Sequence, residues 1–122
     1  MLKDVNVLVI EKEFLIALDI QRMLETLEAG EIVLARNIAD AAQLEHHWPR
    51  IKLAIVEVTL DPQPACALVE RLLANGIAVV LASGDTTLLA RVELLASLPK
   101  VSKPMAENDL VQAIGQAMAL QA

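Results

Sequence analysis

Residues 53–58 read LAIVEV, a short run of aliphatic side chains that contains one carboxylate, Glu57, next to its last position. Apolar runs of this length, rich in β-branched residues, are typical of strands that are buried on both faces of a parallel sheet. Further strand candidates occur along the chain: VNVLVI (5–10), EIVLAR (31–36), AVVLAS (78–83) and the shorter KVSK (100–103). The sequence therefore predicts five strands, the third of which carries a carboxylate close to its end.

Each predicted strand is followed by a segment with helical periodicity. After the first strand, several apolar residues share one helical face, and Gly30 then provides a stop signal: Ile16, Ile20, Met23, Leu24 and Leu27. The other predicted helices run from Asn37, as N-cap, to near Trp48–Pro49, and over 64–76, 86–98 and 108–120. Alternating strands and helices with short connections form a parallel sheet covered on both sides. We therefore predict one α/β domain over residues 1–122, a doubly wound three-layer sandwich.

Composition and charge restrict the classes of function. The net charge of −6 argues against nucleic acid and against an anionic membrane surface, because both need a basic face. No apolar stretch has transmembrane length and the N-terminus lacks a signal-peptide pattern, so we expect a cytoplasmic protein. The single Cys66 cannot form an internal disulfide, and its apolar neighbours predict a buried, inert thiol.

Polar residues follow four of the five predicted strands. In open parallel sheets, ligands bind beyond the carboxyl ends of the strands, so these residues are the candidate site. They are Glu11–Glu13, Glu57–Thr59, Ser83–Asp85 and Lys103–Pro104. A buried carboxylate without a partner is costly, so we expect Glu57 to pair with Lys12 or Lys103.

With these residues in these places, the whole chain resembles the receiver domain of bacterial two-component response regulators. The resemblance implies the flavodoxin-like (βα)5 fold with sheet order 2-1-3-4-5. It also implies a histidine kinase or phosphotransfer protein, and a downstream target, as partners. In family terms, Glu57 stands at the position of the phosphoaccepting aspartate, and Glu11 and Lys12 stand where an acidic pair binds Mg²⁺.

The resemblance also assigns roles to the remaining site residues. Ser83 and Lys103 take the positions that hold the phosphoryl group, and Pro104 takes that of a proline usually preceded by a cis bond. Thr59 takes the position whose backbone carbonyl helps to hold the metal. Lys100 stands where an aromatic switch residue is usual, which suggests an unusual output.

Two substitutions predict a loss of the phosphorylation switch. An ammonium at Lys12 should impair Mg²⁺ binding by Glu11, Glu57 and Thr59, so we expect no cofactor. Glu57 adds a methylene that moves the carboxylate by about 1.5 Å relative to aspartate. We predict a stand-alone pseudo-receiver, not an enzyme, that acts by protein contacts. Lys12 would replace the metal as a fixed counterion, and Glu57 would reach towards Ser83 and Lys103.

Alternative functions remain open. A phosphorylatable response regulator would use Glu57 or a nearby acid, such as Asp61 or Asp85. A flavodoxin-like protein that binds a small ligand is a more remote alternative, because EKEF (11–14) is unlike a Gly-rich phosphate loop. A homodimer is also open.

Two further features of the sequence complete the candidate list. His46 and His47 are predicted to be solvated at a helix end, because adjacent helical positions point about 100° apart. The apolar residues Phe14, Leu15 and Leu18 lie off the main face of the first helix, where exposed apolar side chains can mark a partner site.

Overall fold

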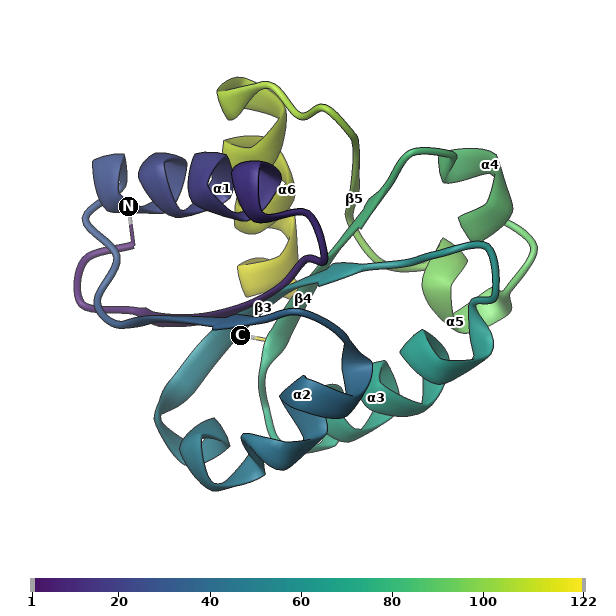
Figure 1. The fold of residues 1–122 in the computed structure, drawn as a ribbon, viewed down its shortest axis with the longest axis horizontal. Coiled ribbons are helices and arrows are strands. Elements are labelled where there is room, and N and C mark those ends of the chain that lie inside the picture. The colour runs from purple at the N-terminus through teal and green to yellow at the C-terminus, as the bar shows by residue number, and fades with distance from the viewer. Residues whose placement is uncertain (1, 122) are drawn as a thin grey trace.

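The computed structural model describes residues 2–121 and contains one five-stranded parallel sheet. The strand order is β2-β1-β3-β4-β5, which confirms the predicted doubly wound topology. The strands are β1 (Asn6–Ile10), β2 (Ile32–Ala35), β3 (Ile51–Glu57), β4 (Ala78–Ser83) and β5 (Lys100–Ser102). The longer helices are α1 (Phe14–Thr26), α3 (Gln63–Ala74) and α6 (Glu107–Leu120), and α2 (Ile38–Gln43) is shorter. Figure 1 shows α1 and α6 on one side of the sheet and α2 and α3 on the other.

Each face of the sheet buries its own aliphatic core. The α1/α6 face contains Ile20, Leu24 and Ile114, and the α2/α3 face contains Leu68 and Leu72. The predicted inward stripe of α1 is confirmed, since Ile20 and Leu24 are fully buried and Ile16, Met23 and Leu27 pack against the same core. Each fully buried aliphatic side chain contributes about 1.5–3 kcal/mol relative to an exposed one. The two cores hold the strands in place and bring their carboxyl ends to one edge.

The first helix ends earlier than the sequence predicted. It stops at Thr26 rather than near Gly30, and Glu28 adopts the left-handed conformation with a φ of 67°. Gly30 serves a different purpose, because a Cβ atom there would lie 2.5 Å from Oδ1 of Asn6. Asn6 Oδ1 accepts the Glu31 N–H at 2.8 Å, so Gly30 allows the chain to pass close to β1 before β2 begins.

The second predicted helix, from Asn37 to near Trp48–Pro49, is divided. The Asn37 cap is confirmed, since Asn37 Oδ1 accepts the Asp40 N–H at 2.8 Å. The α-helix ends at Gln43, however, and the chain continues as a 3-10 helix, η1 (Glu45–Arg50). Pro49 lies in η1 and has no N–H to continue an α-helical hydrogen-bond ladder. The buried indole of Trp48 anchors this tighter turn in the core.

The predicted helix over 86–98 is wrong. The structure has two short helices instead, α4 (Thr86–Leu89) and α5 (Glu93–Ala96), with Val92 extended between them. Leu89 and Leu98 are both buried in the same core. A continuous helix would place these two residues about 180° apart, because nine residues correspond to two and a half turns. The break lets both leucines reach the core.

None of the helices in residues 2–121 is both long enough and apolar enough to cross a membrane.

Candidate functional site

Glu57 is the last residue of β3 and lies at the carboxyl edge of the sheet, between β1 and β4. Its residue surface is 9% exposed, so it is almost fully removed from water. Both carboxylate oxygens nevertheless have partners. Oε2 lies 2.5 Å from Nζ of Lys103, and Oε1 accepts the backbone N–H of Lys12 at 3.2 Å. The carboxylate in the buried strand is therefore paired, as the cost of burial requires.

Glu11 directly follows β1 and is even less exposed than Glu57. Nζ of Lys103 lies 2.9 Å from its Oε1 and 3.2 Å from its Oε2, and the Glu13 N–H donates to Oε2 at 3.0 Å. One ammonium thus bridges two carboxylates that come from different strands. We call Glu11, Glu57 and Lys103 the acid–lysine cluster. It ties together the carboxyl ends of β1, β3 and β5.

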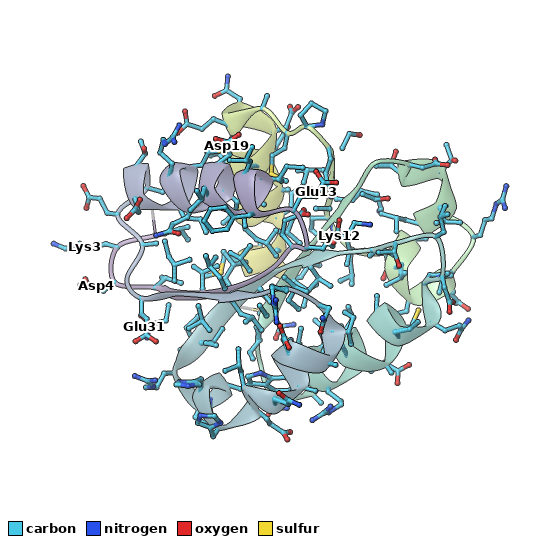
Figure 2. The ribbon with its side chains drawn as sticks, in the orientation of Figure 1. Lys3, Asp4, Lys12, Glu13, Asp19 and Glu31 are labelled. Carbon is cyan, nitrogen blue, oxygen red and sulfur yellow. The ribbon has the colours of Figure 1, made fainter. Side chains whose placement is uncertain are left out.

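Lys12 was predicted to replace the metal as a fixed counterion, and the structure corrects this assignment, whereas the expected contact of Glu57 with Lys103 is confirmed. Lys12 is exposed and forms none of the ion pairs observed within residues 2–121. Figure 2 shows Lys12 beside Glu13 in the loop that leads from β1 to α1. The backbone N–H of Lys12 faces Glu57, whereas Lys103 extends its long side chain from the end of β5 to both carboxylates.

Ser83 does not make the predicted approach to Glu57. Its hydroxyl donates to the Asp85 carbonyl and accepts the Asp85 N–H, both at 3.1 Å, so it is part of the turn after β4. Lys103 makes only a backbone contact with it, from its N–H to the Ser83 carbonyl at 2.9 Å. Ser83, Glu57 and Lys103 still line one open cavity of about 460 Å³, together with Lys12 and Thr59. The site residues share a cavity, but the serine is engaged elsewhere.

Burial is the largest single influence on the pKa of each group in the acid–lysine cluster. At Glu11, burial prevails and raises the pKa of the carboxyl above its ordinary value. At Glu57, the hydrogen bonds from Lys103 and from the Lys12 N–H outweigh burial and hold the pKa of the carboxyl below its ordinary value. The bonds to both carboxylates likewise outweigh burial at Lys103 and raise its pKa. The two carboxyls that share Lys103 are therefore shifted in opposite directions.

The donor set of this site does not fit a divalent cation. Within residues 2–121, no three His, Cys, Asp or Glu side chains gather as a metal site. The two carboxylates that do meet are bridged by the ammonium of Lys103, and position 12 offers a lysine in place of a further acid. Mg²⁺ needs near-octahedral oxygen coordination, which this donor set supplies poorly.

The other acidic candidates form turns. Asp61 Oδ1 accepts the Gln63 N–H at 3.2 Å, and Asp85 Oδ1 accepts the Thr87 N–H at 3.0 Å, where Asp85 caps α4. Both carboxylates face solvent at the rim of the cavity. These local bonds account for the two residues as loop formers.

The remaining candidate residues lie outside the acid–lysine cluster, except for the proline that follows Lys103. The Lys103–Pro104 bond is cis, as predicted. His46 and His47 lie in η1 with their ring centroids 4.2 Å apart. Phe14 and Leu15 are strongly exposed at the start of α1. Leu60, which no pattern in the sequence singled out, is the most exposed large apolar residue of the described range 2–121, at 88%.

Known structures share this arrangement of sheet and helices. No protein-family model matches the sequence, and a search of curated proteins finds no match. Among solved structures, a sensor protein from Polaromonas sp. JS666 is similar, with 22% identity, a TM-score of 0.80 and coverage of 97% of this chain and 98% of that one. The signal receiver domain of an HD domain-containing protein from Pseudomonas fluorescens Pf-5 also has 22% identity, with a TM-score of 0.77 and 98% of both chains covered.

A response regulator receiver domain protein (CheY-like) from Methanospirillum hungatei JF-1 has 16% identity and a TM-score of 0.74, with 98% of this chain and 97% of that chain covered. Identities this low support a shared architecture and leave the chemistry of the site to be argued from its own residues. The protein therefore has the fold of response regulator receiver domains.

Proposed function

We propose that this protein is a receiver-like signalling module that acts through protein contacts without being switched by phosphorylation. Two replaced acids carry this proposal: Glu57 stands at the acceptor position at the end of β3, and Lys12, with an exposed side chain, stands where a second metal-binding acid is expected. The lysine of the family is kept at Lys103, whose ammonium contacts both Glu11 and Glu57. The two replaced positions are therefore what distinguishes this site.

The state of Glu57 supports the same conclusion. A carboxylate that attacks phosphorus needs an oxygen in line with the leaving group, and displacement by about 1 Å is enough to slow such reactions strongly. Hydrogen bonds from Lys103 and from the Lys12 N–H hold the two oxygens of Glu57 in their positions. Without a metal ion, charge developing on the transferred group also lacks its usual neutralisation.

The site imitates only half of a phosphorylated receiver. The lysine that would hold a phosphoryl oxygen is bound to Glu57, whereas the Ser83 hydroxyl remains in the turn with Asp85. A carboxylate carries a charge of about −1, compared with about −1.5 to −2 for a phosphoryl group. We infer a fixed output, transmitted to a partner of two-component signalling such as a histidine kinase, a phosphotransfer protein or their downstream target.

The test is incubation of the full chain with Mg²⁺ and acetyl phosphate, followed by intact-mass spectrometry. We expect no phosphorylated species for the wild-type protein. A variant that combines Lys12→Asp with Glu57→Asp restores both receiver-type acids and serves as the matched control, with Mg²⁺ binding read by titration calorimetry. A stoichiometric phospho-adduct mapped to Glu57 in the wild type would overturn the proposal and favour a phosphorylatable response regulator.

A further inference from the structure

The two edges of the sheet are protected to different degrees. At one edge, β5 has only three residues and begins with Lys100, whose ammonium donates to the carbonyls of Ala96 and Leu98. Short strands and lysines are features that prevent edge strands from pairing with another chain. At the other edge, β2 consists of Ile32, Val33, Leu34 and Ala35, without a charge or a proline. Leu34, 39% exposed, is the only exposed large apolar residue in a strand of residues 2–121.

The free hydrogen-bonding groups of β2 can be assigned from its contacts with β1. The Glu31 carbonyl accepts from Val7, and the Ala35 carbonyl accepts from Glu11, so both face β1. Successive residues of a strand direct their N–H and C=O groups to opposite sides. The N–H and C=O groups of Ile32 and Leu34 therefore point away from the sheet, and those of Val33 point towards β1. Ile32 and Leu34 therefore each offer a free N–H and a free C=O group to a second strand.

We propose that β2 pairs with β2 of a second copy of this chain, antiparallel about a two-fold axis that passes beside Val33. This axis is perpendicular to the sheet, so the α1 side of one copy continues as the α1 side of the other. Even-numbered residues of one β2 strand therefore lie opposite even-numbered residues of the other, and odd opposite odd. Ile32 then lies opposite Leu34 of the other copy in a hydrogen-bonded pair, and the relation is repeated by symmetry. The open groups of both strands are all satisfied, giving a set of four hydrogen bonds.

The side chains also complement each other in this register. Ile32 and Leu34 of the two copies meet on the α1 face, and the two Val33 side chains meet on the opposite face. Cross-strand pairs of apolar and β-branched residues stabilise sheets by about 0.2–1 kcal/mol each. Two parallel β2 strands would not be related by this two-fold axis. The Ile32–Leu34 pair would then not occur twice, and the two Val33 side chains would not meet at an axis.

The ends of β2 carry opposite charges, which favours the antiparallel arrangement. Glu28 and Glu31 are exposed at its start, and Arg36 is exposed just after its end. Their contacts within the chain are long, at 3.6 Å for Glu31 with Arg50 and 3.5 Å for Arg36 with Asp40. Antiparallel pairing brings the acidic end of each strand to the Arg36 end of the other. Stable interfaces bury about 1,200–2,000 Å². The pairing of two four-residue strands buries less surface than this, so we expect a weak, reversible dimer.

The first test measures the association of the full chain by sedimentation equilibrium, from about ten micromolar to about one millimolar. We expect a reversible monomer–dimer equilibrium that Leu34→Lys weakens by at least about tenfold. The matched control is Leu120→Lys, which changes an exposed leucine on α6 and should leave the equilibrium unchanged. A wild-type chain that stays monomeric, or a dimer that survives Leu34→Lys, would show that β2 is not the interface.

The second test examines the register and uses Cys66→Ser as its background. In the proposed dimer the two copies of residue 33 form a non-hydrogen-bonded pair, with Cα atoms about 4.5 Å apart, which suits a disulfide. Oxidation should therefore link Val33→Cys into a covalent dimer, and should link Leu34→Cys and Leu120→Cys much more slowly. Equal rates for the three variants, or faster linking of Leu34→Cys, would overturn the proposed pairing.

Discussion

Two kinds of ion pair stand at opposite ends of the same sheet. At the carboxyl end, the acid–lysine cluster is almost completely buried, with Lys103 side-chain exposure of 11%. At the amino end, Arg50 pairs with Glu31 at 3.6 Å and Arg71 pairs with Glu45 at 2.8 Å, with all four side chains about half exposed. Figure 2 shows Glu31 at the left of the molecule, near Asp4, and Lys12 well away from it beside Glu13.

Burial, rather than the number of contacts, decides how much the loss of such an ion pair costs the fold. Exposed pairs contribute about 0–1 kcal/mol, because water already solvates the separate charges. A buried pair contributes little net stability relative to apolar residues, but loss of one partner leaves a desolvated charge and is costly. The cluster is therefore expected to be sensitive to single substitutions, and the amino-end pairs to be tolerant of them.

The largest effect is expected for Lys103→Met, which leaves two buried carboxylates without a counterion. Removal of one partner from a buried ion pair costs about 3–5 kcal/mol, so the free energy of unfolding in urea at neutral pH should fall by about this amount. The control is a variant that adds Glu11→Gln and Glu57→Gln, which removes the uncompensated charges and should recover most of the loss. If Lys103→Met cost less than about 1 kcal/mol, the cluster would behave like an exposed pair.

A smaller effect is expected when pH is varied, because the two glutamates respond in opposite directions. The lowered pKa of Glu57 means that its ionised form stabilises the fold above the ordinary value of 4.5, and this contribution is lost as pH falls through the folded-state pKa. The raised pKa of Glu11 means that the fold gains stability as pH falls through that raised value towards 4.5.

Thermal unfolding followed by circular dichroism across this range separates the two glutamates. Glu11→Gln should abolish the rise in Tm that accompanies mild acidification towards pH 4.5. Glu57→Gln should instead reduce the fall in Tm below pH 4.5, because the contribution of ionised Glu57 is already absent. An exchange of the two profiles would mean that the proton binds first to Glu57 and that the assignment of the two carboxylates has to be reversed.

The smallest effects are expected at the amino end. Arg50→Ala should change the free energy of unfolding by less than about 1 kcal/mol, because its partner is exposed. Arg71→Ala should cost slightly more, since its guanidinium also lies 5.1 Å from the centroid of the Trp48 ring and such contacts contribute about 0.5–1 kcal/mol. Urea unfolding in low and high salt provides the measurement. A cost for Arg50→Ala equal to that of Lys103→Met would remove the contrast between the two ends.

Much of the fold could be predicted because its signals are local. The aliphatic strands, the inward stripe of α1 and the Asn37 cap all depend on residues within a few positions of one another. The segment over 86–98 could not be predicted in this way. Its division into α4 and α5 satisfies Leu89 and Leu98 in a core that is formed by other parts of the chain.

The site shows the same limit. The placement of Glu11, Glu57 and Lys103 at one edge followed from strand order, but the choice of Lys103 over Lys12 as counterion did not. The sequence offered both Lys12 and Lys103 as partners of Glu57, and nothing in it ranked one above the other. In the fold, its backbone N–H donates to Glu57 and its side chain is exposed.

Periodicity and chain order were enough to indicate most of the strands and helices and the polar residues that reach the carboxyl edge, because these signals are local. The identity of the cation that bridges the carboxylates, and the bonding of the Ser83 hydroxyl, depend on the folded chain. The contacts of Lys103 join residues 92 and 46 positions apart, and no local pattern reports how far a side chain must extend to make them.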